Sequence, residues 1–142
     1  NPEPGMGDGF GISIAVVDTD KIVVGADLDD PSGVVNAGRA YLIDVNTGML
    51  LQIFSNPSPL PFDQFGVSVA AMGTDKVVIG MPAGDVDDGQ MATVPGEVHL
   101  FDINTGTLLR TFSNPRAGTV STPSKANTAT WPRPGLLTQP RW

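Results

Sequence analysis

The sequence predicts an all-β fold built from two copies of one repeat of about 55 residues. The composition is one reason, because 17 Gly and 13 Pro with only 16% charged residues favour short strands joined by turns. A second reason is that residues 10–15 (FGISIA) return as residues 65–70 (FGVSVA). A third is that Ile12, Ile14 and Val16 alternate with other residues at the period of a strand.

Further segments recur in the same order in both copies. Their offset grows from 55 to 58 residues, so the second copy has three extra residues between Gly80 and Gly96, where an insertion costs little. The matched pairs are 19–25 with 74–80, 42–48 with 100–106, and 54–57 with 112–115.

Each copy is predicted to contain four strands joined by tight turns. The β-branched run of residues 21–24 suits a strand, and Asn46-Thr47-Gly48 suits a hairpin turn because Asn and Gly accept positive φ. The predicted strands are 11–17, 21–26, 38–44 and 49–54, then 66–72, 76–81, 96–102 and 107–112.

The repeat divides the chain into residues 1–57, residues 58–115 and a tail at 116–142. The longest links within the two copies are residues 27–37 and 82–95, which are acidic and contain Gly and Pro. These links are the loops with room for a functional site.

Four antiparallel strands in about 55 residues match the size of a β-propeller blade. Each copy places a Phe-Gly pair at the start of its first strand and a Gly near the end of its second: Phe10, Gly11 and Gly25 in the first copy, and Phe65, Gly66 and Gly80 in the second. On these residues the repeat, over residues 8–115, resembles the FG-GAP repeat of integrin-α-like propellers.

The resemblance implies a non-enzymatic, secreted or surface-exposed module for adhesion, binding or assembly, with a protein or a glycan as ligand. Relatives often hold calcium in a loop between the first two strands. The corresponding turns, Asp18-Thr19-Asp20-Lys21 and Gly73-Thr74-Asp75-Lys76, are too short to supply the six to eight oxygens that calcium takes. We therefore expect this usual calcium site to be absent.

Two acidic clusters offer another place for Ca²⁺, since carboxylates held close together repel unless a cation lies among them. Aspartates also cap turns by accepting bonds from their own backbone, and both interpretations stay open. The clusters are Asp27, Asp29 and Asp30 in the first copy, and Asp85, Asp87 and Asp88 in the second.

Catalytic residues are scarce in this sequence. His99 is the single histidine and there is no cysteine, which argues against a zinc site or a histidine-based triad. Ser13 and Ser68 lie in strands without the Gly-x-Ser-x-Gly elbow of a hydrolase. Phe10 and Phe65 fit core positions better than ligand stacking. A lectin-like propeller and a hydrolytic propeller are the alternative functions.

The net charge of −7 argues against nucleic acid and anionic membrane surfaces as partners, because both attract clustered Lys and Arg. No apolar run approaches the roughly 20 residues of a membrane span.

The tail abandons the repeat, although Trp131 and Trp142 could pack on a blade or a neighbouring chain. A third repeat translated in another frame is a second interpretation of it. Two blades cannot close a propeller, since strand edges and apolar faces would stay exposed. We therefore expect a homo-oligomer of three or four chains, giving six or eight blades. The alternative is a fragment of a longer surface protein.

Overall fold

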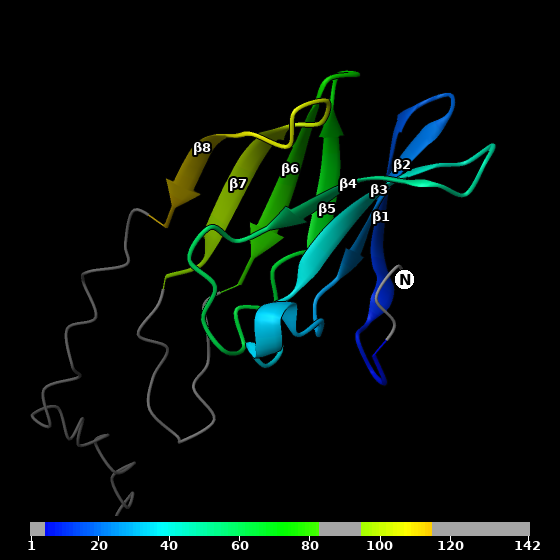
Figure 1. The fold of residues 1–142 in the computed structure, drawn as a ribbon. Helices are drawn as coiled ribbons and strands as arrows, with labels where there is room; N and C mark the ends of the chain where they lie inside the picture. Colours follow the sequence, from blue (N-terminus) through cyan, green and yellow to red (C-terminus); the bar gives the residue numbers. More distant parts are fainter. Residues whose placement is uncertain (1–4, 83–94, 115–142) are drawn as a thin grey trace, which may run out of the picture.

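The structure is a computed structural model that describes residues 5–82 and 95–114. Within these ranges the chain forms eight strands in two four-stranded sheets, which confirms the predicted all-β class (Figure 1). No helix there has the length and hydropathy needed to cross a membrane. The first sheet contains β1 (Phe10–Asp18), β2 (Lys21–Ala26), β3 (Arg39–Asp44) and β4 (Leu50–Ser55), and the second contains β5 (Ser68–Met72), β6 (Lys76–Met81), β7 (Glu97–Asp102) and β8 (Leu108–Ser113).

Both sheets are antiparallel meanders in which each strand pairs with the next one in the chain. The registers repeat as well, since Gly25 pairs with Ala40 in the first sheet and Gly80 pairs with Val98 in the second. A bulge interrupts each outer hairpin at the same place, before Ile43 and before Phe101. The sequence repeat is therefore also a repeat of strand pairing.

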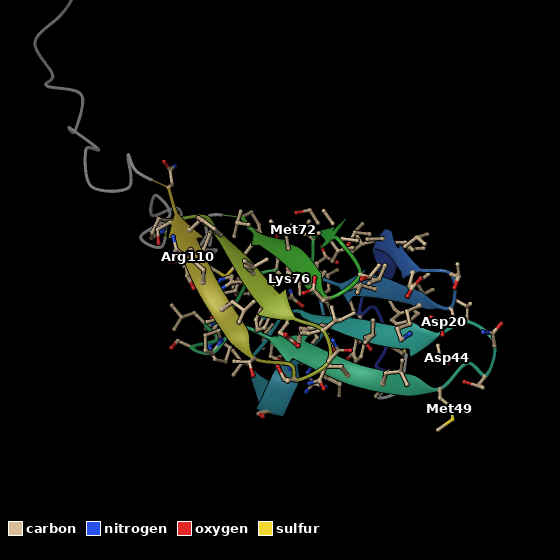
Figure 2. All side chains as sticks on the ribbon, turned by 90° about the horizontal axis from the view of Figure 1, so that it is seen from above. Asp20, Asp44, Met49, Met72, Lys76 and Arg110 are labelled. Atoms are coloured by element: carbon tan, nitrogen blue, oxygen red, sulfur yellow. The ribbon has the colours of Figure 1, made fainter. Side chains whose placement is uncertain are left out.

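The hairpin turns repeat down to single hydrogen bonds. The carboxylate of Asp44 accepts the backbone N–H groups of Asn46 and Thr47, both at 2.9 Å. Asp102 accepts the equivalent pair in the second sheet, also at 2.9 Å. These bonds hold the pKa of both carboxyl groups below the usual value near 3.8. Figure 2 shows Asp20, Asp44 and Met49 together at this end of the first sheet.

Each sheet has two distinct faces, because side chains of directly paired residues lie on the same side. We call the side that carries Ser13 in the first sheet, and Ser68 in the second, the serine face. On the first sheet it comprises Ser13, Ala15, Val23, Gly25, Ala40, Leu42 and Phe54. On the second sheet it comprises Ser68, Ala70, Val78, Gly80, Val98, Leu100 and Phe112.

The hydrophobic core lies between the serine face of the first sheet and the opposite face of the second. Val23, Leu42 and Phe54 contribute from the first sheet, and Ile79 and Phe101 from the second. The rings of Phe54 and Phe101 meet at 5.3 Å between centroids. Strand β1 lies against β5, so the two repeats pack face to face.

Strand β5 begins two residues later than the sequence indicates, which is the largest difference at any strand start. We expected a strand from residue 66, whereas β5 begins at Ser68. Gly66 has φ +94°, which is outside the range of a strand and which other residues rarely adopt. The reason lies in its tertiary surroundings, described next.

Candidate functional site at the junction of the two repeats

The Phe-Gly segment of the second repeat lies directly on the first sheet. Ser13 Oγ donates a hydrogen bond of 2.7 Å to the carbonyl oxygen of Gly66. The backbone N–H of Phe65 donates to the carbonyl of Ala37 at 2.9 Å. Phe65 itself is fully buried. The motif recognised in the sequence is therefore the element that joins one repeat to the next.

Glycines make this close approach possible. A Cβ atom on Gly25 would overlap the carbonyl oxygen of Gly66, and one on Gly66 would overlap that of Arg39. A Cβ on Gly38 would lie 2.6 Å from the backbone nitrogen of Phe65. The three glycines therefore allow backbone to pack against backbone where any side chain would intervene.

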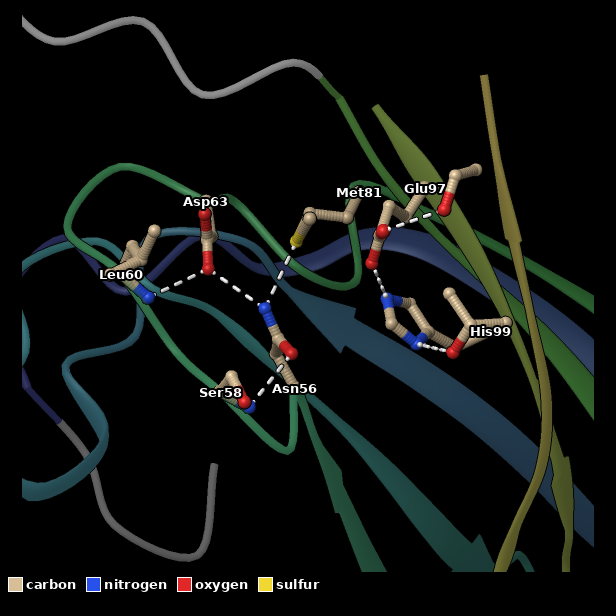
Figure 3. Close-up of polar contacts among 9 residues, drawn as sticks. Asn56, Ser58, Leu60, Asp63, Met81, Glu97 and His99 are labelled. Atoms are coloured by element: carbon tan, nitrogen blue, oxygen red, sulfur yellow. Dashed lines mark hydrogen bonds and ion pairs between the residues drawn. The ribbon is translucent and has the colours of Figure 1, made fainter. Parts of the chain in front are cut away.

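A buried polar network fixes the link between the two sheets (Figure 3). Asp63 is 1% exposed, and its Oδ2 accepts hydrogen bonds from Asn56 Nδ2 at 2.8 Å and from the Leu60 backbone at 2.7 Å. Asn56 Oδ1 accepts the backbone N–H of Ser58 at 3.0 Å. Among the described residues, Asp63 Oδ1 has no hydrogen-bond partner.

His99 packs against this junction from strand β7. It is 1% exposed, and its ring centroid lies 5.5 Å from that of Phe65. Burial lowers its pKa, and the negative charges of Glu97 and Asp63 oppose that shift without reversing it. Its Nδ1 lies 3.2 Å from the hydroxyl of Thr111, and its Nε2 lies 3.4 Å from Glu97 Oε2. Its counterpart in the first repeat is Tyr41, which donates to Asp29.

The acidic loop of the first repeat is held by its own chain. Asp29 is 5% exposed and accepts the hydroxyl proton of Tyr41, with Arg39 Nε 3.8 Å away. Asp30 accepts the backbone N–H of Asn36 at 2.6 Å. Asp27 is 8% exposed. The bond of Asp30 is of the turn-capping kind, whereas Asp29 is bound by side chains of β3. Calcium binding at this loop stays a prediction from the sequence.

No set of three or more His, Cys, Asp or Glu side chains within residues 5–82 and 95–114 is arranged to hold a metal ion. The second acidic cluster, Asp85, Asp87 and Asp88, lies outside the described residues, as do Trp131 and Trp142.

The two Phe-Gly motifs have different surroundings. Phe65 is enclosed between the sheets, whereas Phe10 is 39% exposed and contacts the ring of Tyr41 at 5.8 Å. Phe10 comes at the start of the first repeat, so no sheet of a preceding repeat covers it among the described residues. A core position was expected for both rings, and of the two Phe65 is buried in the core while Phe10 is partly exposed.

Sequence reasoning missed the residues that brace the junction. Asn56 and Asp63 were not singled out, although Asp63 recurs as Asp8 at the spacing of the repeat, two residues before Phe-Gly. Gly38 was also missed, and it recurs as Gly96 directly before the third strand of each repeat. Both recurrences were visible in the sequence and could have been used.

Residues 3–43 match the family model described as the FG-GAP repeat. The first copy therefore carries an FG-GAP repeat, as its motifs predicted, and the match spans β1 to β3. A search of curated proteins finds no match. Among solved structures, the chain is similar to the WD40 domain of Neurospora crassa Pan2, with 11% identity and a TM-score of 0.27. That match covers 71% of this chain and 39% of the Pan2 domain chain.

Proposed function

We propose that this chain is a non-enzymatic propeller module of the FG-GAP type, which self-associates so that its two blades become part of a closed ring. The FG-GAP repeat at residues 3–43 and the face-to-face packing of two four-stranded sheets support the propeller assignment. The proposed role is binding or adhesion outside the cell, which is where proteins with such repeats typically act.

The observation that carries self-association is the apolar surface left at both ends of the stacked pair. Ile14 and Val16 are 62% and 70% exposed on the first sheet, and Phe112 is 49% exposed on the second. Large apolar side chains gathered on one sheet face usually mark a contact surface. An unpaired propeller blade would show such surfaces, because its neighbours bury them in a closed ring.

Sedimentation equilibrium tests the proposal with the full chain at increasing concentration. We expect a molar mass of three or four times 14.8 kDa, since a ring of two-blade chains closes with six or eight blades. A mass of 14.8 kDa at about 100 µM would contradict self-association. The extracellular role is tested separately, by whether a protease added to intact source cells removes the protein.

A further inference from the structure

The two exposed faces of the sheet pair correspond, by the sequence repeat, to the two faces that pack against each other inside the chain. Inside the chain, the serine face of the first sheet packs on the opposite face of the second. This leaves Ile14 and Val16 exposed on the opposite face of the first sheet, and Val98 and Phe112 exposed on the serine face of the second, among the described residues. Val24 and Tyr41, next to Ile14 on the first of these faces, are buried within the chain.

Equivalent positions show the relation directly. Phe54 is 1% exposed in the covered serine face, while its counterpart Phe112 is 49% exposed in the uncovered one. Val69 packs against the core, while its counterpart Ile14 is 62% exposed. Phe112 therefore has a buried counterpart 58 positions away, and Ile14 has a partly buried one 55 positions away.

The second sheet also contains a second docking site for a Phe-Gly segment, which we call the receptor. Ser68, Gly80 and Gly96 hold the positions that Ser13, Gly25 and Gly38 hold in the first sheet. An open depression of about 310 Å³ lies there and is lined by Ser68, Gly80, Gly96 and Val98. The three atoms nearest to a Cβ on Gly80 would all belong to Ser68, whereas a Cβ on Gly25 would meet the docked Gly66.

The matching Phe-Gly segment at the start of the chain is already in the docking conformation. Gly11 has φ +96° against +94° for Gly66, yet nothing lies within 4 Å of a Cβ on Gly11. Upstream, Gly5 donates its backbone N–H to Asp8, as Leu60 does to Asp63. The Phe10-Gly11 segment therefore has the backbone conformation of the docked Phe65-Gly66 segment, although no sheet packs against it among the described residues.

We propose that the serine face of the second sheet binds the opposite face of the first sheet of a second copy of this chain, head to tail. Phe10 and Gly11 of the second copy enter the depression at Ser68, whose hydroxyl donates to the Gly11 carbonyl. The inference rests on the proposed self-association and defines its contact surfaces. A head-to-tail contact also leaves one unoccupied face at each end of the assembly, so that further chains can add until the ring closes.

Two variants that each block one face test this arrangement. Val98→Arg places a charge on the serine face of the second sheet, and Ile14→Arg places one on the opposite face of the first. Each substitution is at an exposed position, 38% and 62% respectively, so the monomer should fold. Each variant alone should associate at least roughly 100-fold more weakly than the native chain, because burying an unpaired charge is costly.

An equimolar mixture of the two variants should form a one-to-one heterodimer, because each supplies the face that the other lacks. If both variants alone keep the native mass, the contact lies elsewhere and the proposed faces are wrong, although self-association stands. If each variant alone is monomeric and the mixture is monomeric as well, the contact is symmetric. That result would overturn the head-to-tail arrangement. A native chain that is monomeric would overturn the proposed function itself.

The receptor is tested by the double variant Ser68→Ala, Gly80→Ala, in which the new Cβ fills the space meant for the Gly11 carbonyl. With the Ser68 hydroxyl gone, the nearest remaining atoms to that Cβ lie 3.6 and 3.8 Å away, so the fold should be kept. We expect an unchanged circular dichroism spectrum and loss of self-association. The matched control is Ser13→Ala, Gly25→Ala, which should lower the melting temperature of the monomer. Native association by the Ser68/Gly80 variant would refute docking at this receptor.

Discussion

At the scale of single residues, the junction depends on small side chains and a few buried polar groups. Gly25 and Gly66 let two backbones meet, and Ser13 supplies the hydroxyl that donates to the Gly66 carbonyl. Asn56 and Asp63 then hold the connecting segment in place. Because Asn56 and Asp63 are buried, removing one of them leaves the other without a hydrogen-bond partner that water could replace, which lowers stability.

Replacing Tyr41 by Phe should lower the free energy of unfolding by about 1.5–3 kcal/mol, because it removes a buried bond to the carboxylate of Asp29. The ring contact with Phe10 is kept, so the change isolates the hydroxyl. Urea denaturation of this variant, of Asp29→Asn and of the double variant gives the coupling energy. A coupling near zero would show that the two groups act independently.

His99 should make stability depend on pH below neutrality. Its folded pKa lies below its usual value near 6.5, so between these two values the unfolded chain binds more protons. Stability is therefore full above about pH 7 and decreases as the pH falls through 6.5 toward the folded pKa. Denaturant midpoints measured from about pH 7.5 to 5.5 should show this decrease.

The control for this pH dependence is His99→Phe, which removes the only histidine side chain. That variant should have a flat profile from about pH 7.5 to 5.5, because histidine is the side chain whose ordinary pKa lies within this range. A variant profile as steep as the native one would assign the dependence to another group.

At the scale of elements, the repeat places identical meanders in different surroundings. The Phe-Gly segment before β5 is docked on a sheet, while the one at the start of β1 has the same backbone and open space around it. The chain therefore offers a matched pair of positions that separate conformational strain from packing.

Gly66→Ala should be more destabilising than Gly11→Ala. Both place a side chain at positive φ, which costs about 1–2 kcal/mol. Gly66→Ala also forces a Cβ onto the carbonyl of Arg39, which adds about 1–3 kcal/mol. Chemical denaturation at a concentration where the chain is monomeric measures the difference. Equal losses would mean that the close approach at Gly66 is not needed for stability.

At the scale of the whole molecule, the chain combines a net charge of −7 with apolar faces at both ends of the stacked sheets. Charge repulsion opposes association of such molecules, and salt screens that repulsion. The apolar faces favour association, because their burial is favourable in proportion to the area removed from water.

The melting temperature should therefore rise with protein concentration, by about 2–5 °C for each tenfold increase, since association stabilises the folded chain. The rise should be larger in about 0.5 M than in about 0.02 M sodium chloride, because the Debye length shortens. Scanning calorimetry at several concentrations measures both effects. The Val98→Arg variant is the control, and its melting temperature should not depend on concentration.

The sequence by itself determined the strands, the turns and the repeat. Strand positions follow from local alternation and from turn residues such as Asn46 and Gly48, which act through their own backbone. The eight observed strands lie within two residues of the predicted bounds for this reason. The FG-GAP motifs were equally local and gave the family of the repeat.

Only the tertiary structure decided which face of each sheet is covered within the chain. Alternation along β1 suggests that the larger residues Ile14 and Val16 are buried, yet the side with Ser13 and Ala15 faces the second sheet. Backbone approaches backbone there, so the contact needs small residues, and the larger ones are left outward. Strand periodicity separates two faces, but it does not say which one meets the neighbouring repeat, because that depends on contacts between residues more than 50 positions apart.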